Sequence, residues 1–102
     1  MPVTVVLSLH INPAKQDEFF DLLRDLAPGT RDYGGCLAYD IYSDRNNRGN
    51  VVFVETWETM AAYEAYNAWR TKTGVMEKLG SYFTGAPSIV FCDREDSWRA
   101  VG

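Results

Sequence analysis

The sequence is poor in the residues from which metal and redox sites are built. Its 102 residues include one histidine, His10, and two cysteines, Cys36 and Cys92. Cysteines so far apart form neither a zinc pattern nor a closely spaced redox pair. Glycine-rich loops for dinucleotides or nucleoside triphosphates are also missing. We therefore expect no metal and no cofactor, and we interpret both cysteines as small buried side chains in a reducing compartment.

Positive charge and long apolar runs are scarce as well. Ten Lys and Arg residues stand against fourteen Asp and Glu, a net charge of −4, so no nucleic-acid partner is expected. No apolar stretch approaches the roughly 20 residues that span a bilayer, so no membrane partner is expected. Residues 1–15 have neither the basic start nor the cleavage site of a signal peptide. These absences predict a cytoplasmic protein.

The chain does contain the alternating strands and helices of a folded domain. Hydrophobic residues make up 46% of it and aromatic residues 14%, too many for a disordered protein. We interpret residues 1–102 as a single domain with a polar C-terminal tail, 95–102. Periodicity and turn residues predict strands at 3–11, 36–43, 51–58 and 88–93, and helices at 13–27, 59–68 and 71–79. Pro28 and Gly29 end the first helix, after which residues 30–33 can add a turn.

The order β-α-β-β-α-β is that of a ferredoxin-like α+β domain, whose four-stranded antiparallel sheet carries its helices on one face. The expected strand order is 4-1-3-2, which puts Cys36 and Cys92 at opposite edges and excludes a disulfide between them. The uncovered face would still be apolar, because Val52 and Val54 on one side of the third strand are as apolar as Val51 on the other. Soluble monomers rarely expose such a face. We therefore predict a homodimer with the two sheets packed face to face.

The third strand carries an acid in an apolar setting. Glu55 and Trp57 lie two residues apart, so they share a face with Val51 and Phe53. A carboxylate on an apolar strand face must be paired, hydrogen-bonded or functional. This segment is therefore the first place to look for a site.

The helix that follows presents an aromatic stripe. Tyr63, Tyr66 and Trp69 recur every three residues and broadly share one helical face. Such a stripe is typical of a core, but buried tyrosine hydroxyls need partners, which favours a partly wet cavity. The basic residues of this region are interpreted as a solvated helix face; they are Arg70, Lys72 and Lys78.

The segments NPAKQDEFFDLLRDL (12–26), GGCLAYDIYSD (34–44) and VVFVETWETMAAYEAY (51–66) resemble the antibiotic-biosynthesis monooxygenase family. The resemblance implies a ferredoxin-like protomer that dimerises into an α+β barrel. Some members oxidise phenolic polycyclic substrates or quinols with O₂, without metal or flavin. Others degrade haem, process or isomerise small molecules, or have no known activity. A shared fold does not choose among these activities.

The resemblance also assigns roles by position. Trp57 matches a strand-end tryptophan that lines the pocket, and Tyr63 matches a tyrosine that polyketide-oxidising members place there. Phe53 stands where such members have an asparagine that assists substrate deprotonation. Quinol-oxidising relatives have histidines at the position of Tyr66 and near Thr71, and both are missing here.

Haem-degrading relatives differ from this chain at two positions. They need an iron-ligating histidine on the helix after the strand-end tryptophan, and this chain has no histidine after His10. The asparagine of their first strand is replaced by Ser8. The resemblance therefore does not favour haem degradation.

Together these observations predict a pocket between sheet and helices for a small aromatic molecule. The candidate catalytic residues, for proton transfer, are Glu55 and His10, the latter being the only side chain with an ordinary pKa near neutrality. The candidate substrate-binding residues are Trp57, Tyr63, Tyr66, Ser8, Trp69 and Tyr39. For Glu55 and Trp57, structural pairing and core packing are the alternative roles.

The predicted function is a cofactor-independent monooxygenase acting on a phenolic or quinol-type aromatic. Two alternatives use the same pocket. One is a small-molecule-binding dimer without turnover, and the other is an isomerase-type enzyme acting on a small oxygenated metabolite.

Overall fold

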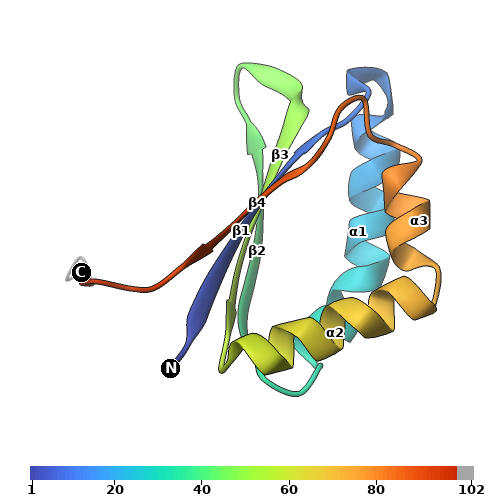
Figure 1. Ribbon diagram of the computed structural model, residues 1–102. Helices are drawn as coiled ribbons and strands as arrows, with labels where there is room; N and C mark the ends of the chain where they lie inside the picture. The colour runs from blue at the N-terminus through green and yellow to red at the C-terminus, as the bar shows by residue number, and fades with distance from the viewer. Residues whose placement is uncertain (99–102) are drawn as a thin grey trace.

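The computed structural model describes residues 1–98 as a four-stranded sheet with helices packed on one face (Figure 1). The elements are β1 (Val3–His10), the short 3-10 helix η1 (Pro13–Lys15), α1 (Gln16–Arg31), β2 (Cys36–Asp44), β3 (Asn47–Trp57), α2 (Met60–Lys72), α3 (Val75–Gly80) and β4 (Ser88–Cys92). Neighbouring strands are antiparallel, in the order β2-β3-β1-β4. The predicted ferredoxin-like α+β fold is confirmed. Cys36 and Cys92 lie in the two edge strands as free thiols.

The register of the sheet determines which side chains meet the helices. Val5 pairs with Glu55, and Leu7 pairs with Phe53. These residues and their alternate neighbours along each strand face α1 and α2. The buried residues form two clusters, one of Leu9, Ile11, Phe19, Leu23, Val51, Phe53 and Leu79, the other of Val3, Val5, Trp57, Tyr63 and Tyr66. No helix among residues 1–98 is both long enough and apolar enough to cross a membrane.

Helix α1 runs through the proline at which the sequence predicted its end. Pro28 has no N–H to donate, yet the helix continues to Arg31. The N–H of Asp32 donates to the carbonyl of Pro28 at 2.9 Å, which closes the turn after the proline. Thr30 in this turn is buried, and its hydroxyl shares a hydrogen bond of 2.7 Å with the hydroxyl of Tyr66. Contact with α2 therefore holds the last turn of α1.

Helix α2 has Thr59 as its N-cap. The hydroxyl of Thr59 accepts a hydrogen bond from the N–H of Ala62 at 3.1 Å. The helix extends to Lys72, past its expected end. Gly74, with a φ of 83°, then separates it from α3. The extension brings Arg70 into the same helix as the aromatic stripe.

The hairpin between β2 and β3 is tighter than predicted. Strand β2 ends at Asp44 and β3 begins at Asn47, before its predicted start at 51, so only a turn at residues 45–46 separates the two strands. Both carboxylate oxygens of Asp44 hold the turn, one accepting from the N–H of Asn46 at 2.8 Å and the other from the amide of Asn50 at 3.1 Å. These bonds lower the pKa of Asp44.

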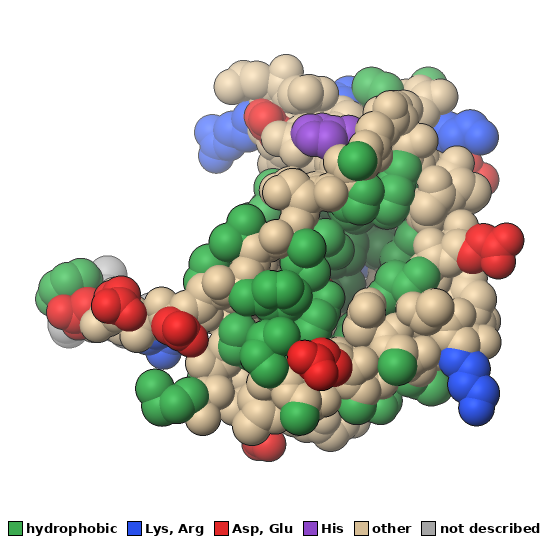
Figure 2. Space-filling view, in the orientation of Figure 1, with side chains coloured by type: hydrophobic (Ala, Val, Ile, Leu, Met, Phe, Trp, Pro, Cys, Tyr) green, Lys and Arg blue, Asp and Glu red, His purple; other side chains and the backbone are tan. Residues whose placement is uncertain are grey.

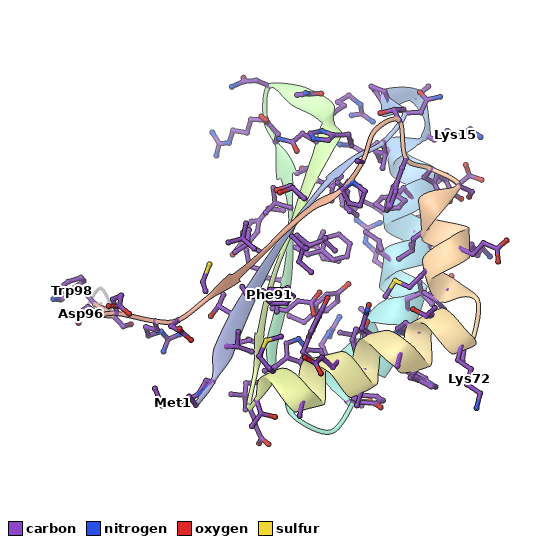
Figure 3. The ribbon with its side chains drawn as sticks, viewed as in Figure 1. Met1, Lys15, Lys72, Phe91, Asp96 and Trp98 are labelled. Atoms are coloured by element: carbon purple, nitrogen blue, oxygen red, sulfur yellow. The ribbon has the colours of Figure 1, made fainter. Side chains whose placement is uncertain are left out.

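The sheet face opposite the helices is apolar in its centre, as expected. Val6 pairs with Val54 and with Val90, and Val52 pairs with Tyr42, so these five side chains share that face. Tyr42 and Val90 are more than half exposed. Figure 1 shows this side of the sheet bare of helices. Residues 93–98 extend away from the body of the protein, with Asp96 and Trp98 at the far end (Figure 3). The remainder of the predicted tail, 99–102, lies outside the described residues.

Gly35 is expected to be the glycine least tolerant of substitution. Its φ is 95°, and a Cβ added to it would lie 2.6 Å from the Cβ of Ala62. Backbone strain and overlap together predict that Gly35→Ala lowers the free energy of unfolding by about 2–4 kcal/mol. Gly74→Ala should lower the free energy of unfolding by about 1 kcal/mol, from backbone strain alone, because no atom lies within 4 Å of the added Cβ. Gly34→Ala meets neither obstacle and should change the value by less than about 0.5 kcal/mol in urea denaturation. Equal values for all three variants would contradict this account.

Candidate functional site

A cavity of about 330 Å³ lies between the sheet and the helices. Figure 2 shows it as a hollow lined mainly by hydrophobic side chains. Its apolar lining consists of Leu7, Leu9, Leu23, Leu26, Phe53, Val75, Met76, Leu79, Phe83, Pro87 and Ile89. Its polar and tyrosine lining consists of Tyr39, Glu55, Tyr63, Tyr66, Asn67 and Arg70. A volume of this size with a few converging polar groups is typical of a small-molecule site.

Strand β3 places a carboxyl group in this apolar lining. Glu55 is 4% exposed, and its Oε1 accepts a hydrogen bond of 2.9 Å from the indole N–H of Trp57. Burial raises the pKa of Glu55, and the bond from Trp57 opposes this rise only in part. A carboxyl group held in this way can exchange a proton closer to neutrality than an ordinary glutamate.

Trp57 lies behind this carboxyl group, outside the cavity lining. Its side chain is fully buried, and its ring lies 4.8 Å from that of Tyr66 and 6.0 Å from that of Tyr63, centroid to centroid. Direct contact between Trp57 and a substrate therefore stays a prediction. Trp57 orients Glu55 and supports the two tyrosines.

Two residues of the aromatic stripe on α2, Tyr63 and Tyr66, line the cavity. Burial raises the pKa of Tyr63 to about 12, with nearby Glu55 and Tyr66 adding to the rise. The phenol of Tyr63 is therefore neutral at physiological pH. The ring of Tyr63 also lies 5.5 Å from that of Phe91 on β4. Phe91, which Figure 3 labels on β4, pairs with Val5 and so lies on the sheet face that meets the helices.

Strand β2 contributes one tyrosine to the cavity. Tyr39 pairs with Glu55 across the sheet and lines the cavity, whereas Tyr42 is exposed on the other face. Burial raises the pKa of Tyr39, and Tyr66 and Glu55 raise it further. Tyr39 was one of the candidate substrate-binding residues, and its contact with substrate stays a prediction.

Arg70 was expected on a solvated helix face, but it is buried. Its side chain is 5% exposed and lines the cavity. The reason is its position on the helix, four residues after Tyr66 and seven after Tyr63, which puts it on their stripe. That spacing was the signal in the sequence. Lys72 and Lys78 are exposed as expected, and Lys72 points away from the body of the protein (Figure 3).

Ser8 and His10 do not face the cavity. Leu7 and Leu9 point toward the helices, so the alternate residues Ser8 and His10 project from the opposite face of β1. His10 is exposed, and Figure 2 shows the histidine on the surface. Their expected placement in this protomer's pocket was therefore wrong.

Trp69 lies beside the site without lining it. Its ring stacks on that of Tyr33, with centroids 5.2 Å apart and planes inclined by 25°. The guanidinium carbon of Arg70 lies 4.5 Å from the centre of the indole. Trp69 thus contributes to the position of Arg70 through a cation–π contact. Its contact with substrate stays a prediction.

Metal ligands do not gather in the described part of the chain. Within residues 1–98, no three histidine, cysteine, aspartate or glutamate side chains come close enough to hold a metal ion together. Among the described residues that line the cavity, Glu55 is the one carboxylate.

Comparison with known proteins identifies the family and the fold of the chain. A family model, antibiotic biosynthesis monooxygenase, matches residues 2–71, which run from β1 to α2. Among curated proteins, no sequence matches this chain.

Several solved structures share the fold. One is a crystal structure of an antibiotic biosynthesis monooxygenase, 28% identical over 92% of this chain and 99% of that chain, with a TM-score of 0.83. A candidate antibiotic biosynthesis monooxygenase of Caulobacter crescentus is 26% identical over 93% and 91%, also at 0.83. A third is a monooxygenase from the gene ActVA-Orf6 of Streptomyces coelicolor, in complex with the ligand nanaomycin D. It is 21% identical over 97% of this chain and 92% of that chain, with a TM-score of 0.82, which shows a shared fold. Because the family model covers more than half of its residues, the chain belongs to the antibiotic biosynthesis monooxygenase family.

Proposed function

We propose that this protein is a cofactor-independent monooxygenase that oxidises a phenolic or quinol-type aromatic molecule with O₂. The observation that carries the proposal is a buried carboxyl group, Glu55, in the wall of an otherwise mainly apolar and aromatic cavity. Membership of a family named for monooxygenases supports it. So does the Streptomyces coelicolor monooxygenase of the same fold, which was solved with a small-molecule ligand.

In this proposal the protein supplies a base and a dry pocket. Glu55 accepts the proton of the phenol, because its raised pKa brings it closer to that of its substrate. A ring carbon of the phenolate then forms a bond to O₂, giving a hydroperoxide once a proton is added. Loss of the ring C–H proton with cleavage of the O–O bond gives a quinone and releases water. One oxygen atom enters the product and the other leaves as water.

Proton transfer is assigned to Glu55 and not to His10, because His10 projects from the opposite face of the sheet. Tyr39, Tyr63 and Tyr66 form walls for a flat ring. Phe53, at the position where the resemblance implies an asparagine, supplies an apolar surface without an amide.

Oxygen uptake with a panel of quinols and phenols, in the presence of a chelator, tests the proposal. We expect stoichiometric consumption of O₂ and formation of a quinone, identified by mass spectrometry. Absence of uptake with every member of the panel would contradict it.

A second candidate is a ligand-binding dimer without turnover, and Phe53 in place of the amide favours it. A metabolite retained through purification but unchanged in the presence of O₂ would support this candidate.

We also propose a homodimer in the cytoplasm. The apolar sheet face of Val6, Tyr42, Val52, Val54 and Val90 gives two sheets a surface to share. The two free thiols suit a reducing compartment. Light scattering at micromolar concentration should give twice the protomer mass, whereas a particle of 11.6 kDa would contradict the dimer.

A further inference from the structure

Arg70 is a buried cation without an acidic partner. Guanidinium groups stay protonated in proteins, so its charge cannot be relieved by losing a proton. The ion pairs within residues 1–98 join Arg24 to Asp21 and Arg48 to Asp17, and Arg70 takes part in neither. Burying a charge without a counter-charge is costly. The cost calls for an anion that is not part of the described chain.

The neighbours of Arg70 fix the guanidinium and leave one end of it free. Its Nε donates to the hydroxyl of Tyr66 at 3.2 Å, and its Nη2 donates to the carbonyl of Leu26 at 2.8 Å and the hydroxyl of Thr30 at 3.1 Å. Gly29 allows this approach, because a Cβ there would lie 3.0 Å from Nη2. Nη1 has no hydrogen-bond partner within residues 1–98. Every fully buried side-chain nitrogen and oxygen in this part of the chain does have a partner, so Nη1 is not fully buried. Nη1 is therefore accessible to a ligand.

The rest of the cavity limits what that ligand can be. Most of the lining is apolar, so the body of the ligand must be apolar too. Arg70 is the only lysine or arginine among the described residues that line the cavity, and it can balance one negative charge. Glu55 in the same lining disfavours a second negative charge, because an ionised carboxylate would repel it.

We propose that Arg70 anchors an anionic oxygen of the substrate, so that the cavity selects aromatic molecules carrying a single negative charge at neutral pH. The anion is a carboxylate or an acidic phenolate, and Nη1 donates to it. This inference rests on the proposed function only in taking the cavity as the substrate site. Arg70 then determines specificity, while Tyr66, Thr30 and Trp69 position it.

Binding of a charged and a neutral probe of the same shape tests the proposal. Hydroxynaphthoate and hydroxynaphthamide both carry a phenol, but only the first carries a carboxylate. Their affinities for the whole protein are measured by calorimetry under nitrogen, so that no turnover occurs. We expect the acid to bind about 10- to 100-fold more tightly than the amide, as for a hydrogen bond to a charged group. Equal affinities, or no binding of either probe, would overturn the proposal.

Variants then assign the preference to Arg70. Arg70→Gln should reduce it to less than about 3-fold, and Arg70→Lys should keep part of it, because the charge remains while the planar fork is lost. Lys72→Gln, two residues further on the exposed face, should leave it unchanged. A full preference in Arg70→Gln would overturn the assignment. Acidic phenols with no carboxylate, compared above and below their own pKa, show whether phenolates are accepted as well.

The outcomes also separate this inference from the proposed oxidation. A protein that prefers the acid but consumes no oxygen with any substrate would contradict the oxidation and support the anion site. A protein that consumes oxygen but binds acid and amide equally would contradict the anion site alone.

Discussion

Trp57→Ala is expected to lower the free energy of unfolding by about 3–5 kcal/mol, the range for truncation of a large buried aromatic side chain. The indole is fully buried between β3 and α2, in contact with Tyr63 and Tyr66. Alanine would leave a cavity there, and it would also remove the N–H that Glu55 accepts at 2.9 Å. A loss of this size is a large fraction of the roughly 5–15 kcal/mol that stabilises a domain.

Urea denaturation followed by circular dichroism measures the effect, with two variants for comparison. Trp57→Phe keeps most of the volume but loses the N–H, so it should cost about 1–3 kcal/mol. Trp98→Ala removes an indole that is 82% exposed, so it should change stability by less than about 0.5 kcal/mol. A loss below about 1 kcal/mol for Trp57→Ala would show that the indole does not support the core.

Glu55→Gln is expected to lower the rate of substrate oxidation by about 10²- to 10⁴-fold, the contribution of a positioned general base. Glutamine keeps an oxygen that can accept the Trp57 N–H, so the site should keep its shape. In the wild type the rate should rise with pH through the raised pKa of Glu55, because only the carboxylate accepts a proton. That dependence should disappear in the variant. Glu58→Gln, an exposed acid just after β3, should keep the wild-type rate.

Stability measurements distinguish this loss of activity from unfolding of the variant. The folded pKa of Glu55 lies above its unfolded value of 4.5, so between the two values the folded state holds more protons than the unfolded chain. Raising the pH through that interval therefore lowers the free energy of unfolding of the wild type. Glu55→Gln escapes this loss, and its stability relative to wild type should increase from pH 4.5 upward before levelling off. An inactive variant that is less stable at neutral pH, or an active one, would contradict the assigned role.

The sequence located much of the site because strand alternation is a strong signal. Glu55 and Tyr39 were expected near one cavity and lie opposite each other on β3 and β2. Alternation alone did not tell which face of β1 meets the helices, because Val6 and Val52 make the other face apolar as well. For that reason Ser8 was placed on the wrong side. Which face of β1 meets the helices depends on how the helices pack, and the sequence of one strand does not contain that information.

The errors in the helices have a different origin. Pro28 was interpreted as a helix end from its local chemistry, but a tertiary contact of Thr30 with Tyr66 keeps the following turn helical. Arg70 was interpreted as solvated because cations usually are. Its place on the aromatic stripe outweighed that general preference, and partners on α1, including the carbonyl of Leu26, made the burial acceptable.

The cavity lies between the two layers of the domain, with Glu55 on the sheet and Arg70 on a helix. An unfolded chain has no such space, so a molecule that fills it binds the native state alone. Each occupant therefore adds to the free energy of unfolding, by about 2.7 kcal/mol at a concentration one hundred times its Kd. Binding of the natural ligand can therefore be detected by calorimetry, as added thermal stability, without knowledge of the reaction. Ranking a metabolite library by the rise in melting temperature would reveal it before any turnover assay exists.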